Sequence, residues 1–179
     1  MIATTRMFGR PVSELNELKE AVSTYISRAA EKLRRQGSAA DTISVFVVPR
    51  EADHAADFRH GSSISSQMKL GAATSFTNEL IKPAVQLVES LYEKGRQYKK
   101  AGVMLSGLVP DDSIQGNIFA KPVANRNRWL MSTVDNVNFS MRDDLLQFGS
   151  NGVNKHWKMR QEFRSPRYTT RWEELQSVS

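Results

Sequence analysis

The stretch Thr42-Ile43-Ser44-Val45-Phe46-Val47-Val48 decides the fold that this sequence predicts. Its alternation puts Ile43, Val45 and Val47 on one face, which is the pattern of a strand with one buried side. Pro49 follows directly, and proline ends a strand because it has no N–H to donate to the ladder. The sequence therefore predicts a half-buried strand over residues 42–48, with a core on one side of it.

A long amphipathic helix precedes this strand. It is predicted over residues 13–36 and is followed by Gly37, which suits the left-handed position after a helix. Acidic residues gather in its first part and basic residues in its last turn, as the helix macrodipole favours. Its apolar positions recur at helical spacing and form one face: Leu15, Leu18, Val22, Tyr25, Ile26, Ala29 and Leu33.

A second helix is predicted further along the chain, ending at Gly95. We expect Pro83 within its first turn, because a proline further inside would remove a backbone hydrogen bond and kink the helix. The candidate caps at its start are Thr74, Ser75 and Thr77. Its apolar face comprises Leu80, Ile81, Ala84, Val85, Val88, Leu91 and Tyr92.

Three further strands complete the pattern, over residues 3–8, 63–70 and 98–105. The first is expected to end at Gly9-Arg10-Pro11. In the last strand, Lys100 faces away from the helices. The residues of that strand that face the helices are Ala101, Val103 and Leu105. The predicted order is β-α-β-β-α-β, and the fold class is α+β: a four-stranded sheet with two helices on one face and the other face open.

The chain changes character after this unit. Residues 110–127 are typical of a linker, because turn-forming residues interrupt any periodicity. Residues 128–179 are predicted to form a small α/β module, with a short helix over 128–137 and a strand over 145–148. The sequence therefore predicts three parts: a domain over 1–109, the linker and the C-terminal module.

Composition limits the classes of protein that remain. The formal net charge is +6, a modest basic bias that favours a polyanionic partner. The chain has no cysteine, which excludes disulfides, thiolate nucleophiles and cysteine-based zinc sites. No apolar run is long enough to span a bilayer, and no signal-peptide pattern opens the chain. We expect a cytoplasmic protein without a membrane partner.

One cluster of cations is predicted to meet phosphates. It comprises Lys94, Arg96, Lys99 and Lys100, with no acid among them. Lys69 and Gln67 can join Lys100 on the open face of the sheet, where charge and hydrogen bonds hold a nucleic-acid backbone without reading its sequence. The alternative is a solvated cluster at a helix C-terminus, where cations are favoured in any case.

The tail over residues 155–172 also has two interpretations. Six cations face one acid, Glu162, and four aromatic side chains are interspersed among them. Cations attract phosphate and rings stack on bases, so the tail is a candidate nucleic-acid or partner contact. In the other interpretation the rings enter a small core and the cations are solvated. The candidate contact residues are Arg164, Arg167, Tyr168, Arg171 and Trp172.

A short peptide in the linker is a candidate protein-binding motif. In Gln115-Gly116-Asn117-Ile118-Phe119, two large apolar residues stand in polar company. Adjacent apolar anchors and a Gln amide suit a groove on a partner, with the peptide ordering on binding. Alternatively, both anchors fold back onto their own domain.

No catalytic or metal-binding pattern is found. The acidic pairs are adjacent in sequence, so their carboxylates point apart and make poor two-metal sites. The three histidines show no ligand spacing. We therefore predict no catalytic residue, no metal ligand and no cofactor in this chain.

The run Ser165-Pro166-Arg167-Tyr168-Thr169-Thr170-Arg171-Trp172, followed by Glu174-Leu175, closely resembles the C-terminal tail of the UmuC family. That family is the polymerase subunit of bacterial error-prone DNA polymerase V, a Y-family translesion enzyme. The stretches Arg6-Met7-Phe8-Gly9, Ile43-Ser44-Val45-Phe46-Val47 and Tyr98-Lys99-Lys100-Ala101-Gly102-Val103-Met104-Leu105 are similar to the little-finger domain of such polymerases. The resemblance covers nearly the whole chain but only the C-terminal half of a polymerase.

This resemblance implies roles for the candidate residues. The open sheet face of a little finger lies against the DNA backbone, and the pair Lys99-Lys100 stands where these domains carry basic contacts. Gln115, Ile118 and Phe119 match the sliding-clamp-binding pentapeptide of bacterial polymerases, whereas Gly116 departs from its usual leucine. The metal-binding carboxylates of the family lie in the palm, so Mg²⁺ is expected only there.

We therefore expect a non-catalytic C-terminal part of an error-prone translesion polymerase, active in the SOS response to DNA damage. Its implied partners are template-primer DNA, the sliding clamp, a UmuD-type dimer and a RecA filament, the last two without assigned residues. One alternative is a stand-alone adaptor or regulator that binds the clamp or another protein without DNA. Another is an unrelated enzyme with a dispersed site.

Overall fold

The computed structural model describes residues 1–50, 62–114, 125–141, 144–159, 165–169 and 171–175. Its elements are β1 (Ile2–Val12), α1 (Leu15–Arg35), β2 (Ser38–Pro49), β3 (Ile64–Thr74), α2 (Thr77–Leu91), β4 (Tyr98–Pro110), α3 (Asn125–Ser140) and two 3-10 turns, η1 (Gly149–Asn151) and η2 (Trp172–Glu174). The β-α-β-β-α-β order is thus confirmed.

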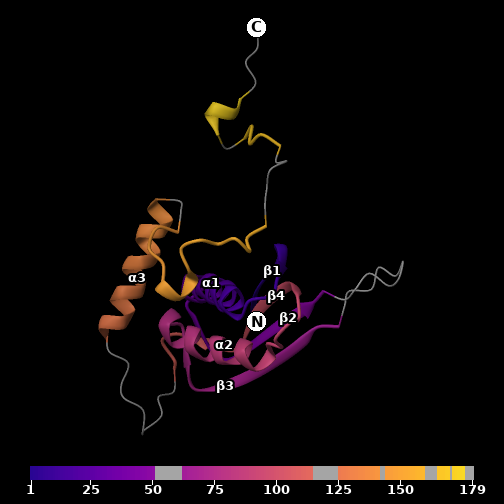
Figure 1. Cartoon of the computed structure of the whole chain (residues 1–179). Helices are drawn as coiled ribbons and strands as arrows, with labels where there is room; N and C mark the ends of the chain where they lie inside the picture. The colour runs from indigo at the N-terminus through magenta and orange to yellow at the C-terminus, as the bar shows by residue number, and fades with distance from the viewer. Residues whose placement is uncertain (51–61, 115–124, 142–143, 160–164, 170, 176–179) are drawn as a thin grey trace.

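The four strands form one antiparallel sheet in the order β1-β4-β2-β3. Helices α1 and α2 pack on the same face of this sheet, α1 against β1 and β4 and α2 against β2 and β3 (Figure 1). Ile43, Val45 and Val47 of β2 are fully buried beneath the helices. The predicted face of the deciding strand is confirmed, and the hydrophobic core lies between this face and the two helices.

Both helices present the predicted apolar faces to the core. Leu18, Val22 and Leu33 of α1 are fully buried, as are Leu80 and Val88 of α2. Burial of an apolar side chain of this size contributes roughly 1.5–3 kcal/mol, so these faces account for much of the attachment of the helices to the sheet.

The end of α1 follows the prediction. The helix stops at Arg35, and Gly37 takes a φ of 64°, the left-handed conformation that glycine adopts at low cost. The start of α1 is two residues later than expected, at Leu15 instead of residue 13.

The predicted end of the first strand is wrong. Strand β1 continues through Gly9-Arg10-Pro11 to Val12, with a register shift against β4 between Met7 and Val12. Because β1 is an edge strand, the missing N–H of Pro11 leaves no neighbouring strand without a donor. An edge position therefore tolerates the residues that would stop a central strand.

The predicted boundaries of the second helix are also wrong. Its N-cap is Phe76, without a side-chain cap, although Thr74 accepts a hydrogen bond from the Phe76 N–H at 3.2 Å. Pro83 lies in the second turn instead of the first, and the helix ends at Leu91, before Gly95. Pro83 is buried, so its packing against the core offsets the backbone hydrogen bond that it cannot make.

The C-terminal region contains the predicted helix but not the predicted strand. Residues 145–148 have no strand pairing. Instead, the side-chain amide of Asn138 in α3 satisfies both backbone groups of Leu146. It donates to the Leu146 carbonyl at 2.9 Å and accepts from the Leu146 N–H at 2.8 Å. A side chain therefore takes the place of a neighbouring strand, and α3 spans Asn125–Ser140, longer than the predicted helix.

Trp157 anchors residues 144–159, called the C-terminal segment below, to the core of the sheet domain. It is only 3% exposed and packs edge-on against Tyr25 and Phe8, at centroid distances of 5.6 and 6.3 Å. Gly9 donates its N–H to the Trp157 carbonyl at 2.9 Å. A Cβ at Gly9 would lie 2.5 Å from the Lys158 carbonyl oxygen, so glycine permits the close approach of the two backbones.

Within the described residues, none of the helices is both long and apolar enough to cross a membrane.

Replacing Trp157 with alanine is expected to lower the free energy of unfolding by about 3–5 kcal/mol, because it empties a filled site between Tyr25 and Phe8. Urea unfolding followed by circular dichroism measures the change. Trp172→Ala is the matched control, since Trp172 is 87% exposed, and its effect should stay within about 0.5 kcal/mol. Equal losses in the two variants would contradict the role given to Trp157.

Candidate nucleic-acid interface

The face of the sheet opposite α1 and α2 is open to solvent. Alternation along each strand brings a second set of side chains to this face. Exposure confirms it on β3, where Ser65, Gln67 and Lys69 are exposed while their neighbours are half-buried. Of the elements that the structure describes, no helix covers this side (Figure 1). The predicted open surface is therefore present.

Three of the five predicted DNA-contact residues lie on this face. Lys100 of β4 stands opposite Val48 of β2, and Lys69 of β3 stands opposite Thr42. Gln67 lies beside Lys69 on the same side of β3, opposite Ser44. The structure thus joins residues that are about thirty positions apart in the sequence into one surface.

The two lysines stand at different ends of the sheet. Their partners on β2, residues 42 and 48, are six positions apart, which corresponds to about 20 Å along a strand. At roughly 3.4 Å of helix axis per phosphate on one strand, this separation spans about six base pairs of duplex DNA. Two cations at this spacing are suited to an extended backbone and not to a single phosphate group.

The middle of the open sheet face is shallow and nearly uncharged. The side chain of Phe46 lies over Gly102, where an added Cβ would meet the ring at 2.5 Å and the Cβ of Thr5 at 2.8 Å. The Lys100 ammonium lies 6.0 Å from the centre of the Phe46 ring. Glycine at position 102 therefore allows the ring to lie flat against the strand, leaving a shallow surface.

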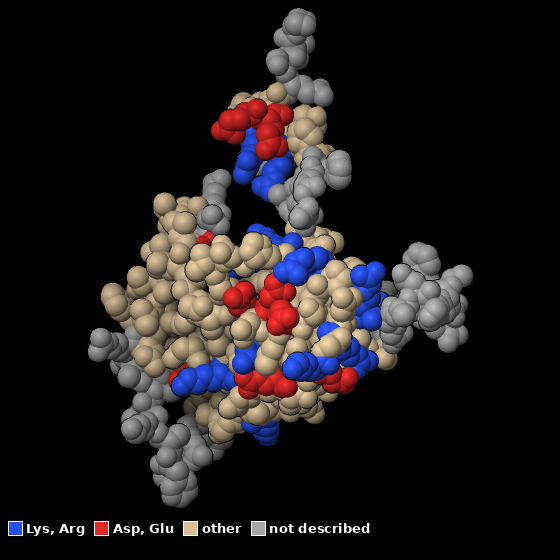
Figure 2. Space-filling view, in the orientation of Figure 1, with Lys and Arg blue, Asp and Glu red and all other residues tan. Residues whose placement is uncertain are grey.

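Charge on this face is partly balanced. The Lys69 ammonium is 3.9 Å from a carboxylate oxygen of Asp41, while its side chain stays 78% exposed. An exposed pair at this distance is weak, so it leaves Lys69 available to a phosphate. Figure 2 shows that, on the side of the molecule drawn there, Lys and Arg are interspersed with Asp and Glu.

The other two predicted contacts lie off the regular part of the face. Lys99 is the extra residue where the pairing of β2 and β4 shifts register, between Lys100 and Tyr98. Arg96 lies in the loop before β4 and holds both carboxylate oxygens of Glu93 at 2.9 Å. The four-cation cluster of the sequence is therefore divided between the loop, the bulge and the open face.

The basic tail divides as well. Trp157 is buried in the core, as the second interpretation of the tail predicted, and is not available for base stacking. Trp172 and Tyr168 are exposed at 87% and 45%, and Arg171 pairs with Glu174 at 3.4 Å. The segment that contains them lies apart from the sheet domain (Figure 1). Arg167 is exposed in the same segment and donates its backbone N–H to Glu174.

Four predicted contact residues lie outside the described part of the chain: Gln115, Ile118, Phe119 and Arg164. Their assignments stay predictions. Among the residues that are described, no group of three or more His, Asp or Glu side chains is placed to hold a metal ion.

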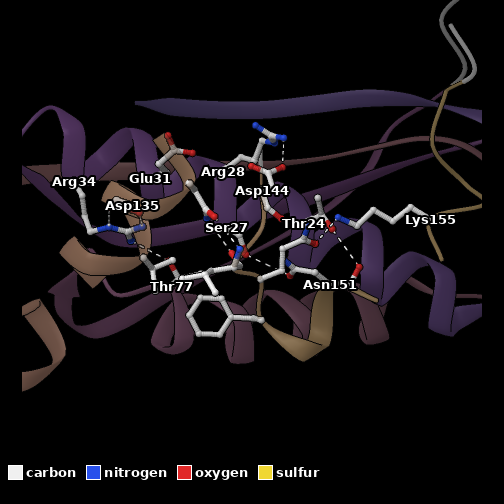
Figure 3. A pocket seen from close by; sticks show the side chains of 15 residues that line it. Thr24, Ser27, Arg28, Glu31, Arg34, Thr77, Asp135, Asp144, Asn151 and Lys155 are labelled. Atoms are coloured by element: carbon white, nitrogen blue, oxygen red, sulfur yellow. Dashed lines mark hydrogen bonds and ion pairs between the residues drawn. The ribbon is translucent and has the colours of Figure 1, made fainter. Parts of the chain in front are cut away.

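A polar junction between α1, α3 and the C-terminal segment was missed at the level of sequence. Arg34 donates to both carboxylate oxygens of Asp135, at 2.6 and 2.7 Å, and to the hydroxyl of Thr77 at 2.9 Å. Figure 3 shows this group at one end of a pocket and Thr24, Asn151 and Lys155 at the other. Arg34 and Asp135 are 101 residues apart, so no local pattern indicates their pairing.

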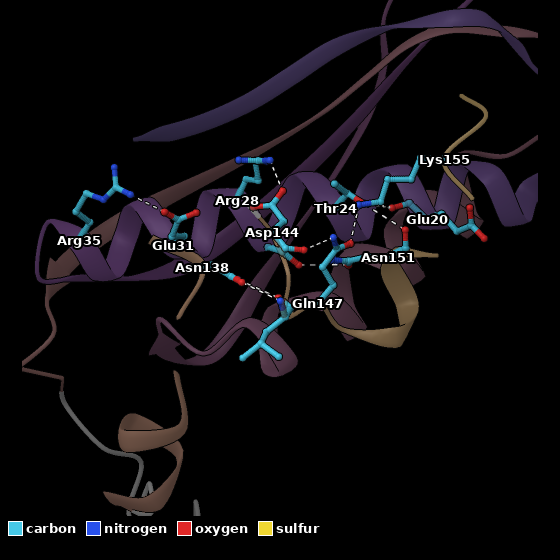
Figure 4. A network of polar contacts seen from close by, with 12 residues as sticks. Glu20, Thr24, Arg28, Glu31, Arg35, Asn138, Asp144, Gln147, Asn151 and Lys155 are labelled. Carbon is cyan, nitrogen blue, oxygen red and sulfur yellow. Dashed lines mark hydrogen bonds and ion pairs between the residues drawn. The ribbon is translucent and has the colours of Figure 1, made fainter. Parts of the chain in front are cut away.

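Arg28 pairs with Asp144 between these two ends. Lys155 donates to Gln147 at 2.6 Å (Figure 4). Buried Asn151 accepts from Ser27 at 3.4 Å (Figure 3). Helix α1 therefore presents its apolar face to the sheet and part of its polar face to the C-terminal segment.

Comparison with known proteins adds independent findings. Residues 1–118 match the family model described as the impB/mucB/samB family C-terminal domain, and residues 128–178 match a domain of unknown function, DUF4113. Protein UmuC of Salmonella typhimurium is 33% identical over 179 residues, covering 99% of this chain and 42% of that protein. Protein SamB of the same organism is 31% identical over 97% of this chain and 40% of its own length.

The chain thus spans about two fifths of the length of these relatives. Among solved structures, a DinB family error-prone DNA polymerase from Sulfolobus solfataricus aligns with a TM-score of 0.47 and 16% identity, over 58% of this chain and 28% of that one. A complex of the β-clamp processivity factor with the little-finger domain of PolIV aligns with a TM-score of 0.40 and 10% identity, over 69% and 96%.

Gly102→Ala is expected to lower the free energy of unfolding by about 1–3 kcal/mol, because the new methyl group overlaps the Phe46 ring and Thr5. Thermal unfolding measures the change. Gly71→Ala in β3 is the control, since a Cβ there meets nothing within 4 Å, and it should be neutral or slightly stabilising. If Gly102→Ala were as well tolerated as the control, the close contact between Phe46 and β4 would be refuted.

Proposed function

This chain belongs to the impB/mucB/samB family, which includes UmuC, and from that premise we propose that it grips template-primer DNA for an error-prone translesion polymerase. In this proposal the duplex lies across the open face of the sheet, and another part of the polymerase forms the phosphodiester bonds. Such a role belongs to the response to DNA damage, and its site of action is the cytoplasm, where bacterial DNA lies.

The observation that carries this proposal is the open sheet face with Lys69, Gln67 and Lys100 on it. The two lysines are offset by about 20 Å along the strand direction and are separated by a shallow, nearly uncharged surface. A rigid sheet with cations at its two ends can follow a duplex along its backbone while making no contact that depends on the base. A polymerase copies any sequence, so the domain that holds its template must bind DNA without preference for particular bases.

A second part of the proposal is a tether to the sliding clamp. Gln115, Ile118 and Phe119 follow the end of β4 closely, so a clamp bound there would lie near the DNA-holding face. Two adjacent apolar side chains can fill a hydrophobic groove, and an intramolecular tether raises the effective concentration of DNA at the sheet. The support for this tether is the sequence pattern and its place in the chain.

We also propose that this chain alone makes no phosphodiester bond. Phosphoryl transfer needs clustered carboxylates that hold Mg²⁺ against the reacting phosphate. The resemblance assigns those carboxylates to a palm domain, and this chain matches only the C-terminal part of its relatives. A UmuD-type dimer and a RecA filament remain proposed partners without assigned residues.

Binding of duplex DNA should weaken in the double variant Lys69→Gln plus Lys100→Gln. Each lysine neutralises about one phosphate, so the slope of log K against log salt should fall by roughly 1.8. Fluorescence anisotropy with a labelled template-primer, measured from low to moderate salt, reports both affinity and slope.

The matched control for this pair is Lys32→Gln plus Lys82→Gln, which removes the same charge from exposed positions on α1 and α2. If the control weakened binding as much as the sheet variant, the general charge of the chain and not the open face would be responsible. Clamp binding without any DNA affinity would favour a protein-interaction adaptor instead.

Binding of the sliding clamp should be lost in Phe119→Ala. A large apolar anchor of this kind is worth about 2 kcal/mol or more, which is roughly a 30-fold loss of affinity. Phe139→Ala is the control, because Phe139 is a 75% exposed phenylalanine outside the motif. Surface plasmon resonance with immobilised clamp compares the two, and an equal response would remove residues 115–119 from the proposal.

A further inference from the structure

A hollow with a strong excess of positive charge lies at the edge strand β1, between β1, α1 and the C-terminal segment. Cations from three parts of the chain line it: Arg6 of β1, Arg28 of α1, and Lys155 and Lys158 of the C-terminal segment. Among the described residues that line it, Asp144 is the one carboxylate, so the formal charge of this described lining is about +3. Alternation places Arg6 on the helix side of β1, opposite Ala101.

The charges in this hollow are unevenly paired. Arg28 is held by Asp144, and Lys155 donates to Gln147 (Figure 4). Arg6 and Lys158 are exposed and make no ion pair within the part of the chain that the structure describes. Two cations without counter-ions therefore face the same space from two segments that are about 150 residues apart in the sequence.

Two buried donors in the same lining also lack acceptors. The Tyr25 hydroxyl and the Trp157 indole N–H are buried and have no hydrogen-bond partner in the described structure, and both side chains line the hollow. Burial raises the pKa of Tyr25 far above its ordinary value, while the nearby Arg6 charge opposes this, so the phenol keeps its proton. An unpartnered buried donor costs about 1–3 kcal/mol.

We propose that this hollow binds a phosphate group. Phosphate carries up to two negative charges and several acceptor oxygens, which suits unpaired cations beside unpartnered donors. A carboxylate offers one charge to a lining with an excess of about three, so phosphate is the better match. This site is separate from the sheet face and does not rest on the function proposed for that face.

The hollow exists only while the C-terminal segment is docked, because Lys155, Trp157 and Lys158 complete it. Phosphate that binds the docked form alone must stabilise docking by mass action. The site thereby links attachment of the C-terminal segment to the presence of a phosphate-bearing ligand.

The test uses Trp157 as a reporter in the full chain. Trp129 and Trp172 are 69% and 87% exposed, so Trp129→Phe plus Trp172→Phe leaves Trp157 as the remaining indole at little structural cost. We titrate this background with inorganic phosphate at constant ionic strength and follow Trp157 fluorescence and thermal unfolding. Binding predicts a saturable change in fluorescence and a higher Tm.

Variants then locate the site. Arg6→Gln and Lys158→Gln should each weaken phosphate binding roughly tenfold, because each removes one charge-assisted hydrogen bond. Lys32→Gln plus Lys82→Gln should bind as the background does, and so should Lys69→Gln plus Lys100→Gln, which separates this site from the sheet face. No saturable response, or equal responses in Arg6→Gln, Lys158→Gln and the controls, overturns the proposal.

A second set of titrations identifies the source of the phosphate. A single-stranded oligonucleotide that competes with inorganic phosphate for the Trp157 signal would make the ligand a nucleic-acid backbone. Response to inorganic phosphate without competition would make it a free phosphate group. Either result supports a phosphate site. The first result would link docking of the C-terminal segment to bound nucleic acid, and the second would link it to a free phosphate group.

Discussion

The structure depends on one constraint, that the four-stranded sheet is buried on one face only. Ile43, Val45 and Val47 of β2, together with Val103 and Leu105 of β4, are fully buried beneath α1 and α2. Because strand side chains alternate, the intervening residues are forced to the opposite face, where no described helix packs. A register shift of one residue would exchange the two faces, so the same pattern that builds the core also determines which residues the open surface presents.

The C-terminal segment depends on the same domain for its position. Its deepest anchor is Trp157, which fills a space between Tyr25 and Phe8, and its polar contacts follow the flank of α1. The pair Arg34–Asp135 is partly buried and bidentate, a geometry that is stronger and more specific than a single exposed ion pair. Removing either partner would leave a charge with reduced access to water, so this pair also selects one way of docking α3.

These two features distinguish two surfaces of the molecule. The open face carries sparse charge on a rigid sheet, which suits contact with an extended backbone. The hollow beside the C-terminal segment gathers Arg6 and Lys158, which make no ion pair among the described residues, and two buried donors without acceptors there. The first surface lies within residues 1–118, which match one family model, whereas the second arises from the meeting of two segments that match separate family models.

Local sequence pattern determined much of the fold. A repeat of apolar residues every 2 or 3.6 positions indicates a strand or a helix with one buried face, whatever the element packs against. This is why the order of the elements, the inward residues of β2 and β4 and the conformation of Gly37 were predictable. Tertiary structure alone decided the rest. Pro11 lies inside a strand because that strand is at the edge of the sheet. Trp157 of the basic tail is buried in the core. Hydrogen bonds from Asn138, and not a neighbouring strand, pair with the backbone at Leu146. The hollow around Arg6 and Lys158 was equally invisible, since charges about 150 residues apart become neighbours only when long-range packing closes the chain on itself.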